Sequence, residues 1–287
     1  MNLGLLYANV GAGVDPGGAL AIARHAEAAG FESIWTVEHV VVPGAYASSY
    51  PYSETGRLPG GEDAPIPDPL IWLAFVAAHT ERIRLATGVL ILPQRSPLVT
   101  AKQVATLDVL SRGRVILGVG VGWLREEFEA IGVPFMGRGA RTDEYIAAMR
   151  ALWAQDQPSF AGTTVSFADA RSWPKPVRRA VPIVIGGHSP AAARRAGRIG
   201  DGFFPGRASI DDLGPLLEEM RRAAEQAGRD PDGIEVTAPA RLDAANLAAL
   251  QALGVSRVVV PTRGLDLATV IAGIDVSAER LRTAGVA

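Results

Sequence analysis

The chain has 287 residues, of which 48% are hydrophobic and 20% are charged, and its formal net charge is −2. This composition is that of a globular protein with a sizeable core, which excludes an intrinsically disordered chain. The 30 acidic and 28 basic residues nearly balance, so no overall positive field favours nucleic acid as a partner. Because cysteine is absent, disulfide frameworks, cysteine nucleophiles and iron–sulfur clusters are excluded as well.

The histidines and the apolar runs argue against a metal enzyme and against a membrane protein. The four histidines are His25, His39, His79 and His188. They do not fall in the spacing of a zinc site, so the sequence predicts no metal. No apolar run approaches the roughly 20 residues that cross a bilayer, and the first residues do not resemble a signal peptide. We therefore expect a cytoplasmic protein with no membrane partner.

Short apolar runs alternate with longer helical patterns from one end of the chain to the other. The runs typical of strands are residues 3–8, 33–37, 83–89, 114–119, 182–185, 202–204, 234–237 and 256–260. The helical patterns include residues 18–29, 97–110, 139–153, 190–198, 211–227 and 244–253, with a last one after residue 266. Eight such units predict an α/β fold, a (β/α)8 TIM barrel that forms one domain over residues 1–287. An open, doubly wound parallel sheet is the alternative.

Two connections are too long for ordinary loops of such a barrel. Residues 40–67 follow the second predicted strand, and residues 155–180 precede the fifth. Long connections without regular structure in a compact domain commonly form lids or binding loops. The first insertion leaves the carboxyl end of its strand, which is the face where barrel active sites lie.

Polar residues that could take part in a reaction lie at the same face. Glu38 and His39 close the second strand, directly before the first insertion. Imidazole has an ordinary pKa of about 6.5, so a histidine in the barrel mouth suits proton transfer. The alternative is a histidine that only hydrogen-bonds the following loop. In the tract 123–128, Glu126 and Glu127 are either catalytic acids or solvated charges.

Glycine-rich turns follow several of the predicted strands. After the third strand, Gly88 either relieves a tight bend or admits a ligand ring against the backbone. Residues 118–122 lack the glycine spacing of a dinucleotide fingerprint, so we reject a Rossmann motif there.

Residues 185–190 join the fifth strand to a helix. Two glycines expose backbone N–H groups, Ser189 can cap the helix, and Pro190 suits its first turn. Such a helix N-terminus is a ready phosphate site, although a plain capped helix start has the same residues. Arg194 and Arg195 follow inside the helix and could add positive charge.

The motifs that carry a family resemblance are spread over nearly the whole chain. They are residues 29–35, 38–39, 86–89, 96–102, 107–108, 111–114, 118–123, 182–190 and 200–203. In this order and spacing they resemble the luciferase-like monooxygenase superfamily, and within it the F420-dependent oxidoreductases. The resemblance implies a (β/α)8 barrel that holds a reduced deazaflavin or flavin at its carboxyl face. It also implies that a cis peptide bond between Gly88 and Val89 supports the cofactor ring, with Thr87 and Gly120 beside it.

The resemblance assigns further site residues. The phosphate site of the family maps onto Gly186, Gly187, His188 and Ser189. The family's histidine near the reactive ring maps onto His39, which the resemblance assigns to stabilising or protonating the reduced cofactor. Glu38, which is assigned to catalysis together with His39, stands where many relatives have aspartate, a change that keeps the acid. Trp123 stands where the sugar-phosphate dehydrogenases of the superfamily carry a glutamate, which argues against sugar-phosphate oxidation and favours an apolar or planar substrate.

These assignments predict hydride transfer between C5 of F420 and a small organic substrate, with His39 managing the proton. Both insertions, residues 40–67 and 155–180, are expected to shape the substrate pocket and exclude water. One alternative is a two-component monooxygenase that uses reduced FMN and O₂. Others are a non-catalytic flavin-binding protein and a cofactor-free hydrolase or isomerase. Arg207 could contact the polar tail of F420, and a homodimer is expected by resemblance alone.

Overall fold

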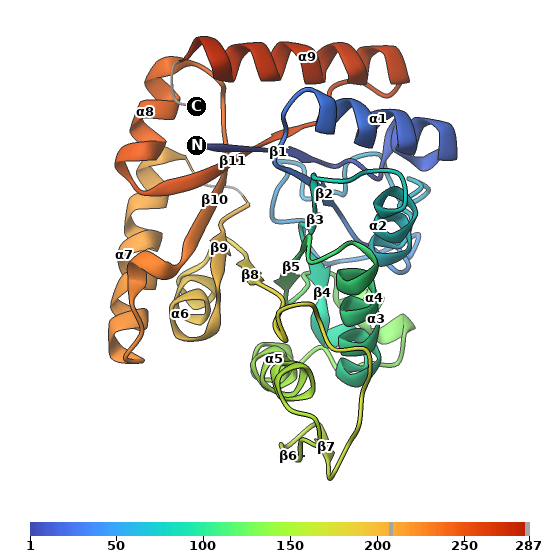
Figure 1. The fold of residues 1–287 in the computed structure, drawn as a ribbon, viewed down its shortest axis with the longest axis vertical. Helices are drawn as coiled ribbons and strands as arrows, with labels where there is room; N and C mark the ends of the chain where they lie inside the picture. The colour runs from blue at the N-terminus through green and yellow to red at the C-terminus, as the bar shows by residue number, and fades with distance from the viewer. Residues whose placement is uncertain (207–208, 285–287) are drawn as a thin grey trace.

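Eight parallel strands close into a barrel in the computed structural model of the chain, which describes residues 1–206 and 209–284 (Figure 1). The strands are β1 (Asn2–Leu6), β2 (Ser33–Thr36), β3 (Arg84–Thr87), β5 (Val115–Gly120), β8 (Ile183–Gly186), β9 (Gly202–Phe204), β10 (Glu235–Pro239) and β11 (Val255–Pro261). Each pairs with the next around the ring, and β11 pairs with β1. The predicted (β/α)8 TIM barrel is confirmed, and the open doubly wound sheet is wrong.

Helices cover the outside of the barrel. They are α1 (Pro16–Ala28), α2 (Pro69–Ala77), α3 (Pro97–Leu110), α4 (Arg125–Ala130), α5 (Arg138–Ala154), α6 (Pro190–Ile199), α7 (Ile210–Gln226), α8 (Ala244–Ala252) and α9 (Leu267–Thr283), with 3₁₀ turns at Gly11–Val14, Leu92–Gln94 and Pro231–Gly233. The helical patterns did not include α2, because its residues are apolar on every side and show no amphipathic period. Among the helices of the described residues, none has the length and apolar character of a membrane span.

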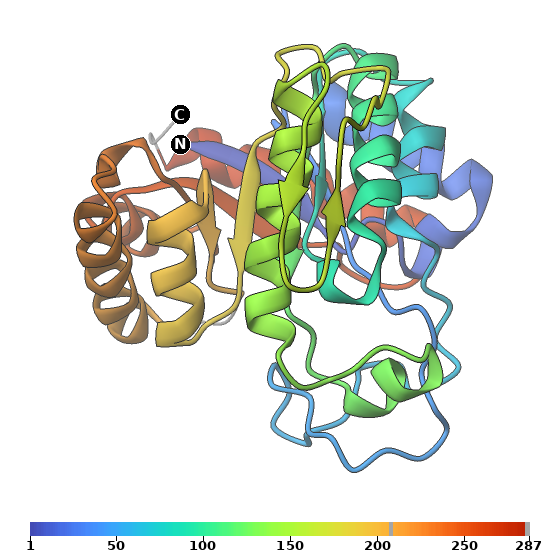
Figure 2. The ribbon, with the colours of Figure 1, turned by 90° about the horizontal axis from the view of Figure 1, so that it is seen from below.

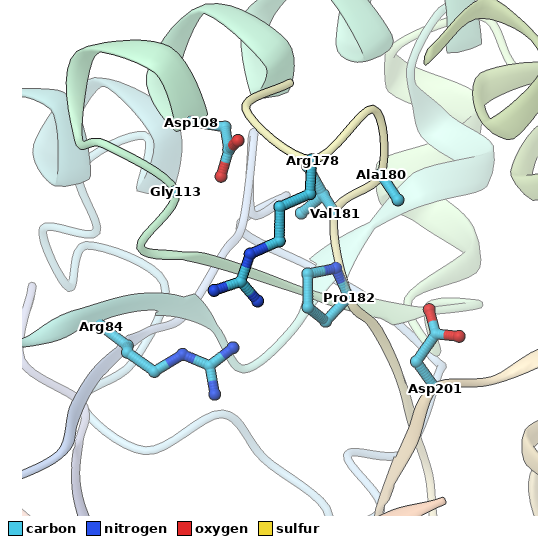
Figure 3. Close-up of a pocket in the computed structure, with 8 residues that line it drawn as sticks. All are labelled: Arg84, Asp108, Gly113, Arg178, Ala180, Val181, Pro182 and Asp201. Atoms are coloured by element: carbon cyan, nitrogen blue, oxygen red, sulfur yellow. The ribbon is translucent and has the colours of Figure 1, made fainter. Parts of the chain in front are cut away.

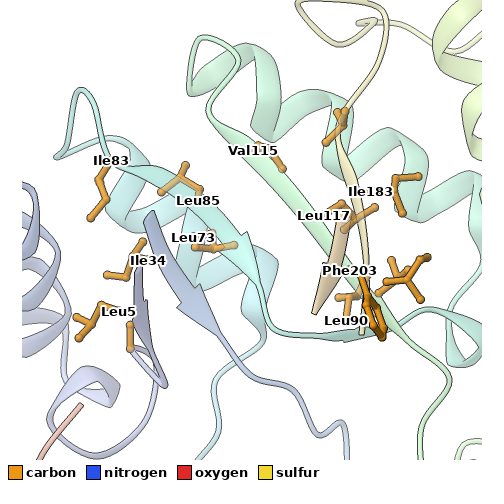
Figure 4. Packing of buried hydrophobic residues seen from close by; sticks show 14 of the residues in the cluster. Leu5, Ile34, Leu73, Ile83, Leu85, Leu90, Val115, Leu117, Ile183 and Phe203 are labelled. Atoms are coloured by element: carbon orange, nitrogen blue, oxygen red, sulfur yellow. The ribbon is translucent and has the colours of Figure 1, made fainter. Parts of the chain in front are cut away.

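Strand side chains alternate between the barrel interior and the surrounding helices. The interior cluster consists of Leu6, Trp35, Ala86, Ile116, Val184, Phe204 and Val259. The residues just before three of them, Leu5, Ile34 and Phe203, belong to the larger cluster between the strands and the helices (Figure 4). Because both faces of the sheet are buried, its strands form the continuous apolar runs from which the barrel was predicted.

The third strand of the barrel is interrupted at the level of the mouth. The sequence predicted one run over residues 83–89. The structure instead has β3, then a cis peptide bond between Gly88 and Val89, and then β4 (Leu90–Ile91), which continues along β5. The cis bond implied by the family resemblance is present. The single run was wrong, because an unbroken apolar stretch gives no sign of where pairing stops.

The two insertions lie at different places on the barrel. Residues 155–180 form a small hairpin of β6 (Phe160–Ala161) and β7 (Ser166–Phe167), and the N–H of Val177 donates to Asp108 at 2.9 Å, near the end of α3. In Figure 2 this yellow-green segment runs along the outside of α5, where the N–H groups of Thr164 and Val165 donate to Glu144 at 2.7 and 2.8 Å, and the blue segment 40–67 lies below. The prediction that residues 155–180 shape the substrate pocket is therefore wrong. A connection from a helix to a strand ends at the amino end of the barrel, away from the site.

A buried arginine fills the amino end of the barrel. Arg257 on β11 is 1% exposed, and it donates to Glu32 at 2.8 and 2.9 Å and to Thr237 at 3.2 Å. Glu235 accepts two further hydrogen bonds from it, each of 3.2 Å. Burial alone would raise the pKa of Glu32, but Arg257 holds it below the ordinary value. The buried positive charge of Arg257 is thus paired with carboxylates on or next to the neighbouring strands.

We expect Arg257→Met to lower the free energy of unfolding by about 3–5 kcal/mol, because it leaves Glu32 without its buried cation. The pH dependence should also change. Since its folded-state pKa is lowered, Glu32 contributes stability above its unfolded pKa of about 4.3, and the contribution is lost as the pH falls below that value. Urea unfolding at neutral pH and at about pH 3.5 should show a smaller acid-induced loss in R257M than in wild type.

Arg282→Met is the matched control, since Arg282 pairs with Glu279 on the exposed surface of α9. Its expected effect is below about 1 kcal/mol. Equal effects of the two substitutions would contradict the structural role of Arg257.

Candidate functional site

The carboxyl ends of the strands form a mouth that the first insertion covers, together with α4 (Figure 2). His39 follows β2, Val89 separates β3 from β4, Trp123 follows β5, and His188 follows β8. Strands that run parallel bring these residues to one face, and the contacts described below link them to one another. The structure thus gathers the residues that the sequence singled out at four different strand ends.

Glu38 joins β2 to the interrupted third strand. Its Oε2 accepts the N–H of Ile91 at 2.5 Å, and its Oε1 accepts from Nε of Arg95 at 2.8 Å. Arg95 also pairs with Asp68, at 2.8 Å, and Asp68 caps α2. The Glu38 carboxylate is buried and fully used in these contacts. The contacts give Glu38 a structural role beneath the mouth, and its direct part in catalysis stays a prediction.

His39 is held by a buried carboxylate from α4. Its Nδ1 lies 3.1 Å from Oε2 of Glu127, and the exposed fractions of the two side chains are 8% and 0%. Oε1 of Glu127 accepts the N–H of Val40 at 2.6 Å and that of Val41 at 3.3 Å. Burial opposes ionisation, but the hydrogen bonds from His39 and Val40 lower the pKa of Glu127 below its ordinary value. Nε2 of His39 is therefore the ring nitrogen that remains for a ligand.

Glu126 fixes the same insertion at a second point. Its Oε1 accepts the N–H of Ala47 at 2.7 Å and that of Ser48 at 3.2 Å. Desolvation acts against ionisation, yet hydrogen bonds from Ser48 and Ala47 lower the pKa of Glu126 to about 2. The interpretation of Glu126 and Glu127 as solvated charges is wrong, since both bind backbone N–H groups of the insertion. One sign of this role is present in the sequence: two adjacent acidic residues in a chain whose long, irregular insertion has backbone N–H groups in need of acceptors.

Aromatic rings line the mouth from one predicted site histidine to the other. The ring of Trp123 lies edge-to-face with those of His39 and Tyr50, at centroid distances of 5.8 and 5.1 Å. Burial raises the pKa of Tyr50 and Tyr52, so their hydroxyls stay neutral. We call this set the aromatic wall; it consists of His39, Tyr46, Tyr50, Tyr52, Trp123 and His188.

Glycines make room for the interruption of the third strand. A Cβ on Gly120 would lie 2.5 Å from Cγ2 of Val89, and a Cβ on Gly186 would overlap Cγ1 of the same side chain. A Cβ on Gly88 would meet Trp35 of the interior cluster at 3.1 Å. The Val89 side chain is thus seated between the ends of β5 and β8, and the Gly88–Val89 backbone forms the floor of the mouth. Contact of Gly120 with a cofactor stays a prediction.

Thr87 has its hydroxyl engaged inside the barrel. Its Oγ1 donates to the carbonyl of Gly118 at 2.6 Å, and the residue is 1% exposed. This bond ties β3 to β5 just below the floor of the mouth. The hydroxyl is therefore used within the sheet, and contact between Thr87 and a cofactor stays a prediction.

The turn after β8 prepares the N-terminus of α6. Gly187 has a φ of 127°, a conformation that favours glycine. Ser189 caps the helix by accepting the N–H of Ala192 at 3.2 Å, as the sequence predicted. Because Pro190 has no N–H, the N–H of Ala191 is left without an acceptor in the helix. A backbone of this kind fits the phosphate group that F420 and FMN share.

The arginines of α6 do not serve this turn. Arg194 pairs with Glu219 at 2.8 Å, and Arg195 pairs with Asp143 on α5. The expectation that they add charge to the phosphate site is wrong, because both guanidinium groups are bound to neighbouring helices. Arg207, the other expected contact, lies outside the described residues.

A cavity of about 200 Å³ lies at the amino end of the barrel (Figure 3). Arg84 and Arg178 extend into it, and Asp108 and Asp201 stand at its edge. Arg84 also pairs with Glu32 at 3.2 Å, and none of the residues predicted for the site lines this cavity. Among residues 1–206 and 209–284, no group of three metal-ligating side chains is present. The candidate site is therefore the mouth at the opposite end.

The comparison with known proteins agrees with this geometry. The sequence matches the family of luciferase-like monooxygenases over residues 3–252. The chain belongs to this family, and it is an oxidoreductase. An uncharacterized protein of Mycobacterium tuberculosis is 36% identical over 233 residues, which are 80% of this chain and 80% of that protein. An F420-dependent glucose-6-phosphate dehydrogenase of Amycolatopsis mediterranei is 35% identical over 219 residues, which are 73% of this chain and 61% of the dehydrogenase.

Solved structures show the same architecture. The monooxygenase RslO1 from Streptomyces bottropensis superimposes with a TM-score of 0.77 at 25% identity and covers 99% of both chains. The coenzyme F420-dependent tetrahydromethanopterin reductase from Methanopyrus kandleri gives a TM-score of 0.76 at 18% identity, over 99% of this chain and 98% of the reductase. At this lower identity the likeness concerns the fold alone.

We expect Gly186→Ala to lower the free energy of unfolding by about 1–3 kcal/mol, because its Cβ overlaps Cγ1 of Val89. Val89→Ala removes the γ carbons and should restore part of this loss in the double variant. A double-mutant cycle by urea unfolding should therefore give a favourable coupling of about 1 kcal/mol or more.

Gly214→Ala serves as the control, since Gly214 lies within α7 and its Cβ would meet nothing within 4 Å. This substitution should change the free energy of unfolding by less than about 1 kcal/mol, because the gain in helix propensity is opposed by Pro215, which disfavours the helical conformation for a preceding residue that has a Cβ. If the changes in unfolding free energy of G186A and V89A simply added in the double variant, the contact that we assign between position 186 and the Val89 side chain would be contradicted.

Proposed function

We propose that the protein is an F420-dependent oxidoreductase, which transfers a hydride between the deazaflavin and a small organic substrate. The observation that carries the proposal is the layout of the mouth. The Gly88–Val89 floor lies between His39, after β2, and the capped N-terminus of α6, after β8. Relatives from Amycolatopsis mediterranei and Kineococcus radiotolerans, 35% and 33% identical, are named F420-dependent glucose-6-phosphate dehydrogenases, which favours F420 as the cofactor.

Each part of the mouth then has a task. F420, when bound, supplies two-electron hydride chemistry. The backbone N–H groups at the start of α6 hold the phosphate group, and the Gly88–Val89 backbone supports the ring. Nε2 of His39 accepts or returns the proton that accompanies the change at the substrate, while Glu127 holds Nδ1. The insertion 40–67, fixed by α4, keeps water out of the mouth.

The aromatic wall favours a planar or apolar substrate. Flat rings offer large contact areas and few charged groups, which suits the binding of such molecules. By resemblance, Trp123 occupies the position of the glutamate of the sugar-phosphate dehydrogenases, and its ring contacts His39 directly. We therefore propose that this chain does not oxidise a sugar phosphate, although two of its relatives carry that name. The homodimer implied by the resemblance stays a prediction.

A reduced-FMN monooxygenase is the second candidate. RslO1, which is 25% identical and shares the fold over its whole length, is named a monooxygenase. Both cofactors carry a phosphate group, so the α6 N-terminus serves either one. A non-catalytic flavin-binding protein is a weaker candidate, because it would have no use for the His39–Glu127 pair.

The choice of cofactor is tested by direct binding. In anaerobic calorimetric titrations, we expect F420 to bind with a Kd of about 1 μM or below, and reduced FMN to bind at least about tenfold more weakly. A preference for reduced FMN would move the proposal to monooxygenation, with O₂ consumption as the next assay. Binding of neither cofactor would overturn the proposed function and leave the fold unaffected.

The phosphate site is tested by a charge at the N-terminus of α6. Ser189→Asp keeps a good helix cap but places a negative charge at the N-terminus of α6, so F420 should bind about tenfold more weakly. Ser189→Ala loses the cap without adding charge and should change the affinity much less. Thermal unfolding of both variants shows that the barrel is intact. Equal affinities of S189D and wild type would place the phosphate elsewhere.

A further inference from the structure

The carboxylate of Glu127 makes two kinds of contact at the same time. Its Oε1 accepts two N–H groups of the first insertion, and its Oε2 lies 3.1 Å from Nδ1 of His39. Glu126, the preceding residue of α4, has only the first kind of contact, with a different part of the insertion. The chain therefore holds two neighbouring carboxylates, of which one reaches the histidine and the other does not.

The pair of Glu127 and His39 is shielded from water. The Glu127 side chain is completely buried, and that of His39 is 8% exposed. The ring of Trp123 lies edge-to-face with the imidazole, at a centroid distance of 5.8 Å. An ionised carboxylate can only accept hydrogen bonds, so the Nδ1 atom that it faces has to be the donor. In the neutral ring, Nε2 then carries a lone pair and no proton.

We propose that Glu127 is a positioning residue for His39: it fixes the ring with its proton on Nδ1, so that Nε2 faces the ligand in the mouth as an acceptor. The proposal rests on the proposed function in that the ligand is the substrate of hydride transfer. The position of the ring proton, in contrast, is a property of the protein alone. It can be measured without cofactor or substrate.

Glu127→Gln tests the proposal with almost no change of shape. Two N–H donors, from Val40 and Val41, face Oε1, so the oxygen of the glutamine amide has to stay on that side. The amide NH₂ group then faces Nδ1 of His39 as a donor. Nδ1 has to accept, and the ring proton moves to Nε2. Glu126→Gln is the matched control, because it alters the adjacent carboxylate and the same insertion without touching His39.

The measurement is a long-range ¹H–¹⁵N correlation spectrum of the histidine rings at about pH 9, where imidazole is ordinarily neutral. The signals of His39 are assigned by their loss in His39→Asn. We expect the Nδ1–H tautomer in wild type and in E126Q, and the Nε2–H tautomer in E127Q. A purely structural role of Glu127 in holding the insertion would leave all three spectra alike.

A wild-type ring protonated on Nε2 would overturn the proposal, and so would an E127Q ring that keeps the wild-type tautomer. If E127Q fails to fold, the wild-type spectrum still decides, since only the Nδ1–H form agrees with a donor to Glu127. Failure of the proposed function has a different signature. The tautomer then changes in E127Q as expected, while F420 does not bind to wild type.

Discussion

The carboxylate of Glu127 accepts hydrogen bonds from the backbone that leaves β2 and lies within hydrogen-bond distance of Nδ1 of His39, and the mouth depends on these contacts. A segment of the length of 40–67 carries many N–H groups that no strand or helix satisfies. Glu126 and Glu127 supply acceptors at two separate points of it, from one short helix. Because the same helix holds both the cover of the mouth and its histidine, the position of His39 is coupled to the position of the cover. Displacement of the insertion would therefore disturb the position of His39, and the reverse also holds.

The floor of the mouth follows from a second constraint, which is steric. The third strand can be interrupted only if the Val89 side chain finds space, and glycines at the ends of β5 and β8 provide it. The family resemblance assigned Gly120 and Gly186 to the cofactor. In the structure, the absence of a Cβ atom at these two glycines makes room for the side chain of Val89. The floor at this point thus depends on three strands: β5 and β8 each lack a side chain there, and the third strand is interrupted.

The sequence was sufficient for what repeats along the chain and insufficient for what depends on distant contacts. Strands that are buried on both faces form continuous apolar runs, so the barrel and most of its elements could be predicted. The Ser189 cap could be predicted as well. Glu127 and His39 are 88 residues apart, and no local pattern connects them. The error on residues 155–180 was avoidable, since a helix-to-strand connection belongs to the amino end of a barrel. The interruption at Gly88 was known only from the family resemblance.

The two ends of the barrel are separated by its interior cluster, and this separation has a consequence for specificity. The amino end holds the buried charge of Arg257, whose loss would cost much of the stability of the fold. The carboxyl end holds the aromatic wall, in which three of six members come from the insertion 40–67. Substitutions of these three tyrosines change rings of the aromatic wall and leave the strands untouched. On the proposed function, the choice of substrate would therefore vary through Tyr46, Tyr50 and Tyr52 while the floor, the histidine and its carboxylate keep their geometry.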